Sequence, residues 1–221
     1  ITILIALSIP LTVGLGFWQI DRAAQKRAIE EARFASYGAL PIDEHQLRSA
    51  GTFARARIEG RYDGAHQFLI DNYTRRGVSG YAVVTVFETL GGQRLLVNRG
   101  WEGAPVSREQ LPEPPVPEGR IQITGMLWNP SRATTDTSTW DSGWPKRVQH
   151  FDGERMSQAA DGAIPIELRL EEGQPGSLMP IIVGEEMSAS RHTAYAAQWF
   201  AMAAALVAAF VILGLRRGRE E

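Results

Sequence analysis

Two long stretches without a charged residue stand at opposite ends of the chain. The first covers residues 1–20 and the second covers residues 193–215. About 20 apolar residues in a helix span a hydrocarbon core of about 30 Å. A helix in the core of a soluble protein would carry a polar stripe, and neither stretch has one. The sequence therefore predicts two transmembrane helices. We expect the first to be retained, because its apolar run is longer than that of a cleaved signal peptide.

Two spans place both chain ends on the same side of a membrane. The tail at residues 216–221 is rich in arginine, and short basic flanks are retained in the cytoplasm. We therefore expect a cytoplasmic tail, and an extracytoplasmic domain at residues 21–192, in the periplasm of a bacterium or the intermembrane space of a mitochondrion. Basic residues flank the spans on the outer side too, but charges that border a long translocated domain weigh less. These residues are Arg22, Lys26, Arg27 and Arg191.

Composition limits the chemistry available to the middle of the chain. The 23 basic and 25 acidic side chains nearly balance, so the sequence offers no cationic face for nucleic acid. Cysteine is absent, which excludes disulfides, thiolate metal sites, iron–sulfur clusters and a cysteine nucleophile. No nucleophile–base motif of a hydrolase is present either. We therefore predict a protein that is not an enzyme.

The middle segment begins as helix and then becomes rich in strand formers. Helix-forming residues from Asp21 to Phe34 extend the first span to about residue 36, before Gly38 and Pro41. Asp152 can cap a short helix that runs through residue 160. We predict an α+β membrane protein in which two transmembrane helices flank an antiparallel sheet or small barrel with one or two helices. The predicted strands are residues 55–62, 67–73, 81–90, 93–98, 121–128, 164–170 and 178–183.

One β-hairpin can be predicted in register. The pair Gly91-Gly92 is typical of a two-residue hairpin turn. That turn would place Phe87 opposite Leu96 and Val86 opposite Val97. Apolar residues on both faces of residues 81–87 indicate an interior strand.

The second span opens with a histidine followed by two aromatic residues. His192, Tyr195 and Trp199 are spaced i, i+3, i+7 and share one helix face at the outer membrane surface. They could be an interfacial aromatic belt beside a solvated histidine. Alternatively, His192 is an axial haem ligand and the rings pack against a flat apolar cofactor. Met202 lies on a similar bearing, where a packing role competes with that of a second ligand.

The first span carries an aromatic and basic face of its own. Trp18, Arg22 and Lys26 are spaced by four residues. An interfacial tryptophan with snorkelling cations is one interpretation. In the other, the cations meet the acidic groups of a ligand, such as haem propionates.

Small residues recur along the second span at four-residue intervals. Such a row lets another helix approach closely. With Gly14 and Gly16 of the first span, it predicts either that the two spans pack as a hairpin or that another membrane protein docks here. The row consists of Ala197, Ala201, Ala205 and Ala209.

Short motifs along most of the chain resemble those of one family. Gly16-Phe17-Trp18-Gln19 with Arg22 and Lys26 is similar to the junction motif of the surfeit locus protein 1 family. His192, Tyr195 and Trp199 resemble its second-span signature. The strand motifs that match in the same order are Gly60-Arg61-Tyr62, Asp71-Asn72, Gly80-Tyr81 and Leu96-Val97-Asn98-Arg99-Gly100-Trp101.

The resemblance implies a role in assembling haem-copper cytochrome c oxidase. Members have two spans around an extracytoplasmic domain, and bacterial members are implicated in binding haem a for insertion into subunit I. Carried over by position, His192 becomes the axial-ligand candidate. Tyr195 and Trp199 become pocket walls, with Trp18 and Arg22 as further cofactor contacts. The alternative is a haem-free scaffold or accessory subunit that stays bound to the oxidase or to a respiratory supercomplex.

Overall fold

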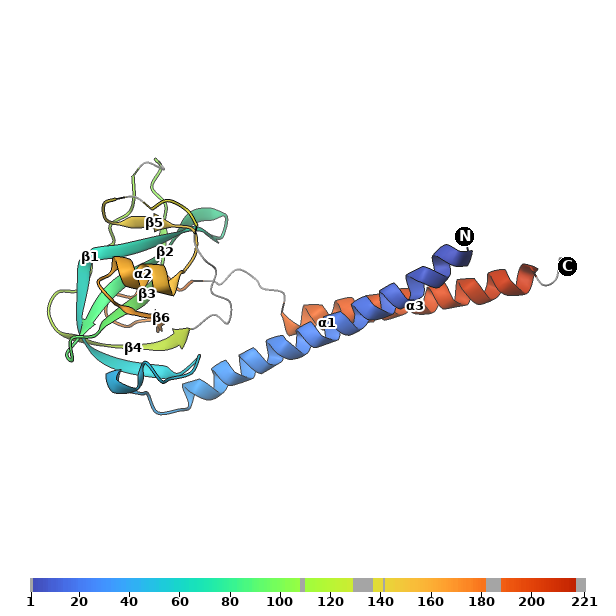
Figure 1. The fold of residues 1–221 in the computed structure, drawn as a ribbon, viewed down its shortest axis with the longest axis horizontal. Coiled ribbons are helices and arrows are strands. Elements are labelled where there is room, and N and C mark those ends of the chain that lie inside the picture. The colour runs from blue at the N-terminus through green and yellow to red at the C-terminus, as the bar shows by residue number, and fades with distance from the viewer. Residues whose placement is uncertain (1, 108–109, 129–136, 141, 182–187, 218–221) are drawn as a thin grey trace. The chain divides into compact units, whose positions relative to one another are not determined.

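The structure, a computed structural model, describes residues 2–107, 110–128, 137–140, 142–181 and 188–217 (Figure 1). The chain divides into two compact units. Among the described residues, 2–34 and 188–217 belong to a helical unit, and those between 35 and 181 belong to a β unit.

The helical unit consists of two long helices that run antiparallel, side by side. Helix α1 extends over Thr2–Tyr37 and α3 over Ala189–Arg217 (Figure 1). Both are long and apolar enough to cross a membrane, which confirms the two predicted candidate spans. Helix α1 continues well past residue 20 and ends immediately before Gly38, whose N–H bonds to the carbonyl of Ala35.

The two helices meet along a narrow line of buried residues, which we call the helix seam. Its members are spaced by three, four or seven residues, the pattern of helices that pack at a shallow angle. All are Ala, Gly or Thr except Gln19 and His192. On α1 the seam contains Thr12, Gly16, Gln19 and Ala23, and on α3 it contains Ala189, His192, Ala196 and Ala203.

The alanine row predicted to pack the two spans together lies outside the helix seam, so that prediction is wrong. Ala197, Ala201 and Ala205 are exposed, and Ala209 is only half-buried. Because a helix has 3.6 residues per turn, residues spaced strictly by four move gradually around it. The residues of the helix seam are spaced by three, four or seven and therefore stay on one side. Of the two glycines, Gly16 lies in the helix seam and Gly14 is exposed, with no atom within 4 Å of where its Cβ would stand.

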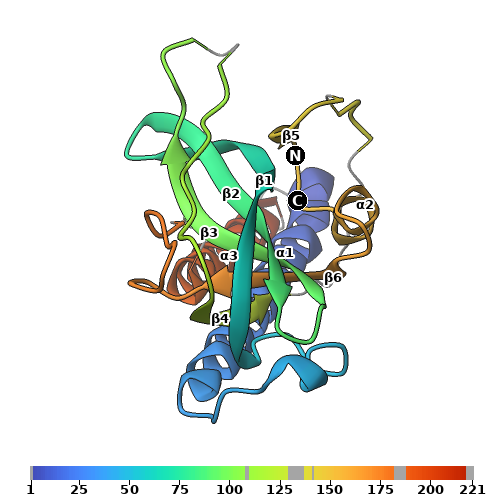
Figure 2. The same ribbon diagram turned by 90° about the vertical axis from the view of Figure 1, so that its left-hand side faces the viewer.

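The β unit is a closed barrel. Five strands pair in the ring β1-β2-β3-β6-β4-β1, and a short strand β5 adds to β1 (Figure 2). The predicted small barrel is thus confirmed, but its sheet is mixed rather than purely antiparallel, because the β3–β6 and β1–β5 pairs are parallel. The bounds are β1 Arg55–Arg75, β2 Val78–Thr89, β3 Arg94–Gly103, β4 Ile121–Trp128, β5 Lys146–Val148 and β6 Ile164–Leu170.

Strand β1 closes the ring because it pairs with two neighbouring strands. Its beginning pairs with β4, and the residues from Gly60 onward pair with β2. Register shifts between Asp63 and Gln67, and again before Tyr73, bend the strand. The separate strands predicted at residues 55–62 and 67–73 are therefore one strand. The strand predicted at 178–183 is reduced to a single bridge between Trp101 and Met179, and residues 182–183 lie outside the described part.

The predicted hairpin between β2 and β3 exists, but its register is shifted by one residue. Val86 pairs with Leu96 and Phe87 with Leu95. The loop has three residues rather than two, because Thr89 pairs with Gln93 and Gly92 takes a positive φ of 77°. A three-residue loop ending in a left-handed glycine is the next common hairpin geometry.

Both faces of β2 are buried, as predicted for an interior strand. Phe87 packs in one apolar cluster, and Val84 and Val86 pack in another on the opposite face. Helix α2, at Gly153–Ala159, lies beside β6 and adds Met156 to that second cluster (Figure 2). Asp152 caps it as predicted, accepting the N–H of Arg155 at 3.1 Å. A 3-10 turn at Glu44–Gln46 precedes the barrel.

Candidate functional site

The candidate ligand His192 lies in the first turn of α3, inside the helix seam. Only 6% of the residue is exposed. Its Nδ1 lies 2.6 Å from Oε1 of Gln19, which is equally buried on α1. An amide oxygen can only accept, so this arrangement corresponds to the tautomer that carries its hydrogen on Nδ1. In that tautomer Nε2 is unprotonated, and Gln19 is the ring's one polar side-chain partner within the described residues.

The two aromatic candidates on α3 flank the helix seam. Trp199 is half-buried, whereas Tyr195 is 44% exposed. Phe200, next to Trp199, packs edge-on against Phe17 of α1 with ring centroids 5.4 Å apart. The expected face is thus split: the histidine points into the hairpin, and the tyrosine lies on its outer surface. Met202 is exposed as well.

On α1, the aromatic and basic candidates lie outside the helix seam. Trp18 is 48% exposed, and the guanidinium of Arg22 stands 5.6 Å from the centre of its ring. Arg22 also donates to the side chain of Gln25 at 3.1 Å. These contacts are local to one helix surface, which suits an interfacial anchor and leaves the cation at the protein surface.

An open pocket of about 520 Å³ lies between the two helices, close to His192 in sequence. Arg27 and Glu30 line it from α1, and Ser190 and Thr193 line it from α3. Nη2 of Arg27 donates to the hydroxyl of Thr193 at 3.3 Å. The pocket thus combines a cation, a carboxylate and hydroxyl groups at this end of the hairpin.

The donor set of the helical unit does not resemble the ligand set of a bare metal ion. Within the described residues, no three His, Asp or Glu side chains come together as ion ligands. A porphyrin supplies four nitrogens itself, so one neutral imidazole nitrogen is sufficient. His192 is the candidate for such a nitrogen; it is buried in the helix seam, whereas Tyr195 and Trp18 lie on the outer surface of the hairpin.

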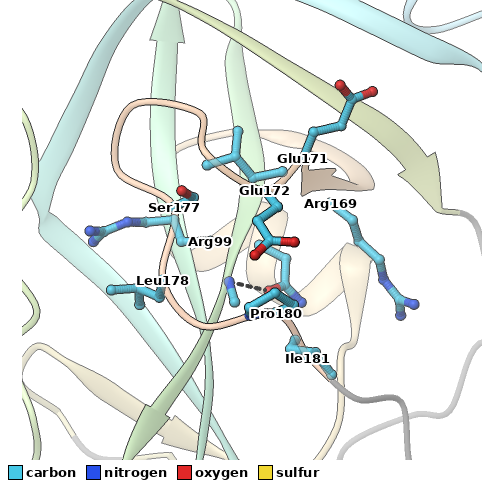
Figure 3. A pocket seen from close by; sticks show the side chains of 11 residues that line it. Arg99, Arg169, Glu171, Glu172, Ser177, Leu178, Pro180 and Ile181 are labelled. Atoms are coloured by element: carbon cyan, nitrogen blue, oxygen red, sulfur yellow. Dashed lines mark hydrogen bonds between the residues drawn. The ribbon is translucent and has the colours of Figure 1, made fainter.

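The pockets found in the β unit suit no large cofactor: two have volumes of about 250 and 270 Å³, and a third lies beside Arg99. The volume of this third pocket is about 150 Å³, below the range of about 300–1,000 Å³ for ligand sites. The guanidinium groups of Arg99 and Arg169 point away from it (Figure 3). One of its internal contacts is the hydrogen bond from the Gly100 N–H to Oδ1 of Asn98.

Arg99 instead holds the barrel's connections in place. It is 3% exposed, and desolvation lowers the pKa of its guanidinium. Nε donates to the carbonyl of Gly176 at 2.7 Å, and Nη2 to that of Pro115 at 2.6 Å. Nη1 reaches oxygens of Gln67, Thr85 and Pro114 at 3.3–3.5 Å. The role of Arg99 is therefore structural.

Gln19 is the site residue that the sequence did not single out. In the sequence it was noted only as part of the junction motif, next to Trp18. The signal that would have found it is the shared spacing of the seam residues, which puts the polar Gln19 and His192 among small ones.

Comparison with known proteins gives a consistent result. The model of the SURF1 family matches residues 6–204. A SURF1-like protein of Rickettsia felis is 25% identical over 103 residues, which make up 45% of this chain and 45% of that protein. One from Rickettsia conorii is 26% identical over 102 residues, 44% of this chain and 42% of that protein. The matched stretch thus spans less than half of these relatives.

Proposed function

Because this chain belongs to the SURF1 family, a family of cytochrome c oxidase assembly factors, we propose that it binds haem a and assists its insertion into subunit I. The observation that carries the proposal is the buried hydrogen bond between Nδ1 of His192 and Gln19. With Nδ1 engaged by Gln19, Nε2 is the ring nitrogen that can serve as an axial ligand. Haem a is then the cargo of this protein, and its iron supplies the redox chemistry of the oxidase.

Residues around His192 would hold the rest of the cargo. Tyr195, Trp199 and Trp18 offer aromatic surface to the porphyrin, and Arg22 offers a cation to a propionate. The exposure of Tyr195, Trp18 and Arg22 on the hairpin supports a site that is open enough to release its cargo. We place the site on the outer side of the membrane, with both chain ends in the cytoplasm or matrix.

The exposed small residues of α3 support docking in the plane of the membrane. Ala197, Ala201 and Ala205 lie outside the helix seam and leave room for a close helix–helix contact. Gly14 offers a similar small surface on α1. We propose that subunit I, or another oxidase subunit, packs against these residues while the cargo is transferred.

The test is an optical spectrum of the full chain purified from cells that make haem a. We expect a Soret band and a red-shifted α band in the wild type, both lost in His192→Ala. His150→Ala is the matched control, since His150 is exposed in the β unit and should leave the spectrum unchanged. Circular dichroism checks that each variant is folded.

The same exposed alanine row favours a second candidate, a haem-free scaffold or accessory subunit of the oxidase or of a respiratory supercomplex. A colourless wild-type protein that still co-purifies with the oxidase would establish the scaffold and exclude the haem carrier. Turnover of a test ester by the purified protein would contradict both.

A further inference from the structure

We propose that Gln19 is the positioning residue of His192: it holds the proton on Nδ1 and so keeps Nε2 available as a ligand. The inference rests on the proposed haem site for its purpose, but the tautomer itself is a property of the protein alone. Gln19 would act through the histidine and would not contact the iron.

The geometry assigns this role to Gln19. The two residues are 173 positions apart in the chain, yet Oε1 and Nδ1 meet at 2.6 Å inside the helix seam. Both side chains are almost completely buried. Burying a donor without an acceptor is unfavourable, so the ring is held with Nδ1–H toward the amide oxygen.

The partner of the second ring nitrogen determines how a histidine ligand behaves. An acceptor on Nδ1–H fixes the tautomer and the ring orientation, and it makes the ligating nitrogen more basic. In the helix seam the other members are too small to do this, and the hydroxyl of Thr12 bonds to carbonyls of its own helix at 2.9 and 3.0 Å. Gln19 therefore supplies the function alone among the seam residues.

The same bond could instead serve only to set the register of the hairpin. A polar pair inside an apolar helix interface is known to do so. The two roles differ in what they predict, because a register device changes stability but does not require a particular protonated nitrogen. The experiment must therefore measure which nitrogen of the His192 ring carries the proton.

Three variants of the full chain separate the possibilities. Gln19→Leu removes the acceptor at similar size, and Gln19→Glu keeps an oxygen acceptor and strengthens it. Thr12→Val is the matched control, since it alters a buried polar seam residue that does not bond to His192.

The first measurement is ¹⁵N NMR of histidine-labelled, haem-free protein, with the His192 signals assigned by difference from His192→Ala. In the wild type, in Gln19→Glu and in Thr12→Val we expect protonated Nδ1 and unprotonated Nε2. Gln19→Leu should lose this preference. A wild-type ring with its proton on Nε2, or a Gln19→Leu ring that is unchanged, would overturn the assignment.

The second measurement is the midpoint potential and affinity of the haem-loaded variants. We expect Gln19→Leu to bind haem about 10- to 100-fold more weakly and at a higher potential. Gln19→Glu should shift the potential downward. Equal potentials with haem bound through His192 would refute positioning and leave the proposed function intact. A wild type with the expected tautomer but no haem would refute the proposed function, and with it the purpose assigned to Nε2.

Discussion

Buried polar side chains have different structural roles in the two units of the chain. In the helical unit, Gln19 and His192 satisfy each other across two helices. In the β unit, the guanidinium of Arg99 is bonded to carbonyl oxygens from two separate connections, at Pro114–Pro115 and at Gly176. It also lies over the ring of Tyr62 at 5.4 Å. The long proline-rich connection needs such an anchor, because proline lacks an N–H with which to join a sheet.

Removing the guanidinium of Arg99 should lower the stability of the β unit. We expect Arg99→Met to lower the free energy of unfolding by about 3 kcal/mol, since it leaves several buried oxygens without a donor. Arg61→Met is the control: its ion pair with Glu88 is at the surface and should be worth less than about 1 kcal/mol. Chemical denaturation of the full chain, followed by near-ultraviolet circular dichroism, measures both. Equal losses in the two variants would contradict the anchoring role.

Tyr62 gives the β unit a predictable response to alkaline pH. Burial raises the pKa of its phenol above the ordinary value of about 10. The unfolded chain then loses this proton before the folded one does. The stabilising contribution is therefore complete below about pH 10 and is lost as the pH rises above it, by at most about 1.4 kcal/mol per pH unit.

Tyr62→Phe removes this titration, together with a hydrogen bond of 3.2 Å to the carbonyl of Pro175. We expect the variant to be somewhat less stable at neutral pH and to lose less stability between about pH 9 and 11. Denaturation midpoints at several pH values test the slope. A residual slope is expected from Tyr73, whose pKa is also raised by burial. If stability fell with pH as steeply in Tyr62→Phe as in the wild type, the pKa of Tyr62 would not be raised by folding.

At the level of elements, the sequence predicted what periodicity and composition determine. Both long helices, β4 and β6 follow from local patterns. The hairpin was found, but its loop length was not, because Leu90-Gly91-Gly92 is compatible with a two- or a three-residue loop and the pairing of Thr89 decides it. Strand β5 has three residues and no local signal; its pairing with β1 creates it.

The candidate site was predicted in part, for a related reason. The motif identified His192 as a candidate ligand, but it did not predict that His192 is buried. Which face of α3 meets α1 depends on the partner helix, so the alanine row looked as suitable for packing as the true helix seam. Gln19 could not be recognised as the partner of His192 until the two helices were placed in register.

The two glycines of α1 provide a direct test of the helix seam. A Cβ on Gly16 would stand 2.6 Å from the ring of Phe200, whereas one on Gly14 would meet nothing within 4 Å. We expect Gly16→Ala to destabilise the hairpin by about 1–3 kcal/mol through overpacking, and Gly14→Ala to leave it unchanged or slightly more stable.

The measurement uses energy transfer between dyes on two introduced cysteines, at exposed Leu11 and Val207, during a titration with a denaturing detergent. The chain has no cysteine of its own, so labelling is specific. If Gly14→Ala separated the helices more easily than Gly16→Ala, the seam would be placed on the wrong face.

For the molecule as a whole, the arrangement in the membrane decides whether the proposed function is feasible. The site around His192 is at the start of α3, next to the β unit in sequence and far from the basic tail. A site that delivers haem on the outer side therefore requires the β unit to be outside the cytoplasm. The excess of arginine at residues 216–221 argues for that orientation.

Single cysteines can report this orientation, one per variant. Val106 is fully exposed in the β unit, and Glu221 ends the basic tail. We expect a membrane-impermeant maleimide to label Val106→Cys in intact spheroplasts, and Glu221→Cys only after lysis, because the bilayer shields the cytoplasmic side. Labelling in lysed membranes is the control that both thiols are reactive. The reverse pattern would place His192 at the cytoplasmic surface, and transfer of haem on the outer side would then have to be abandoned.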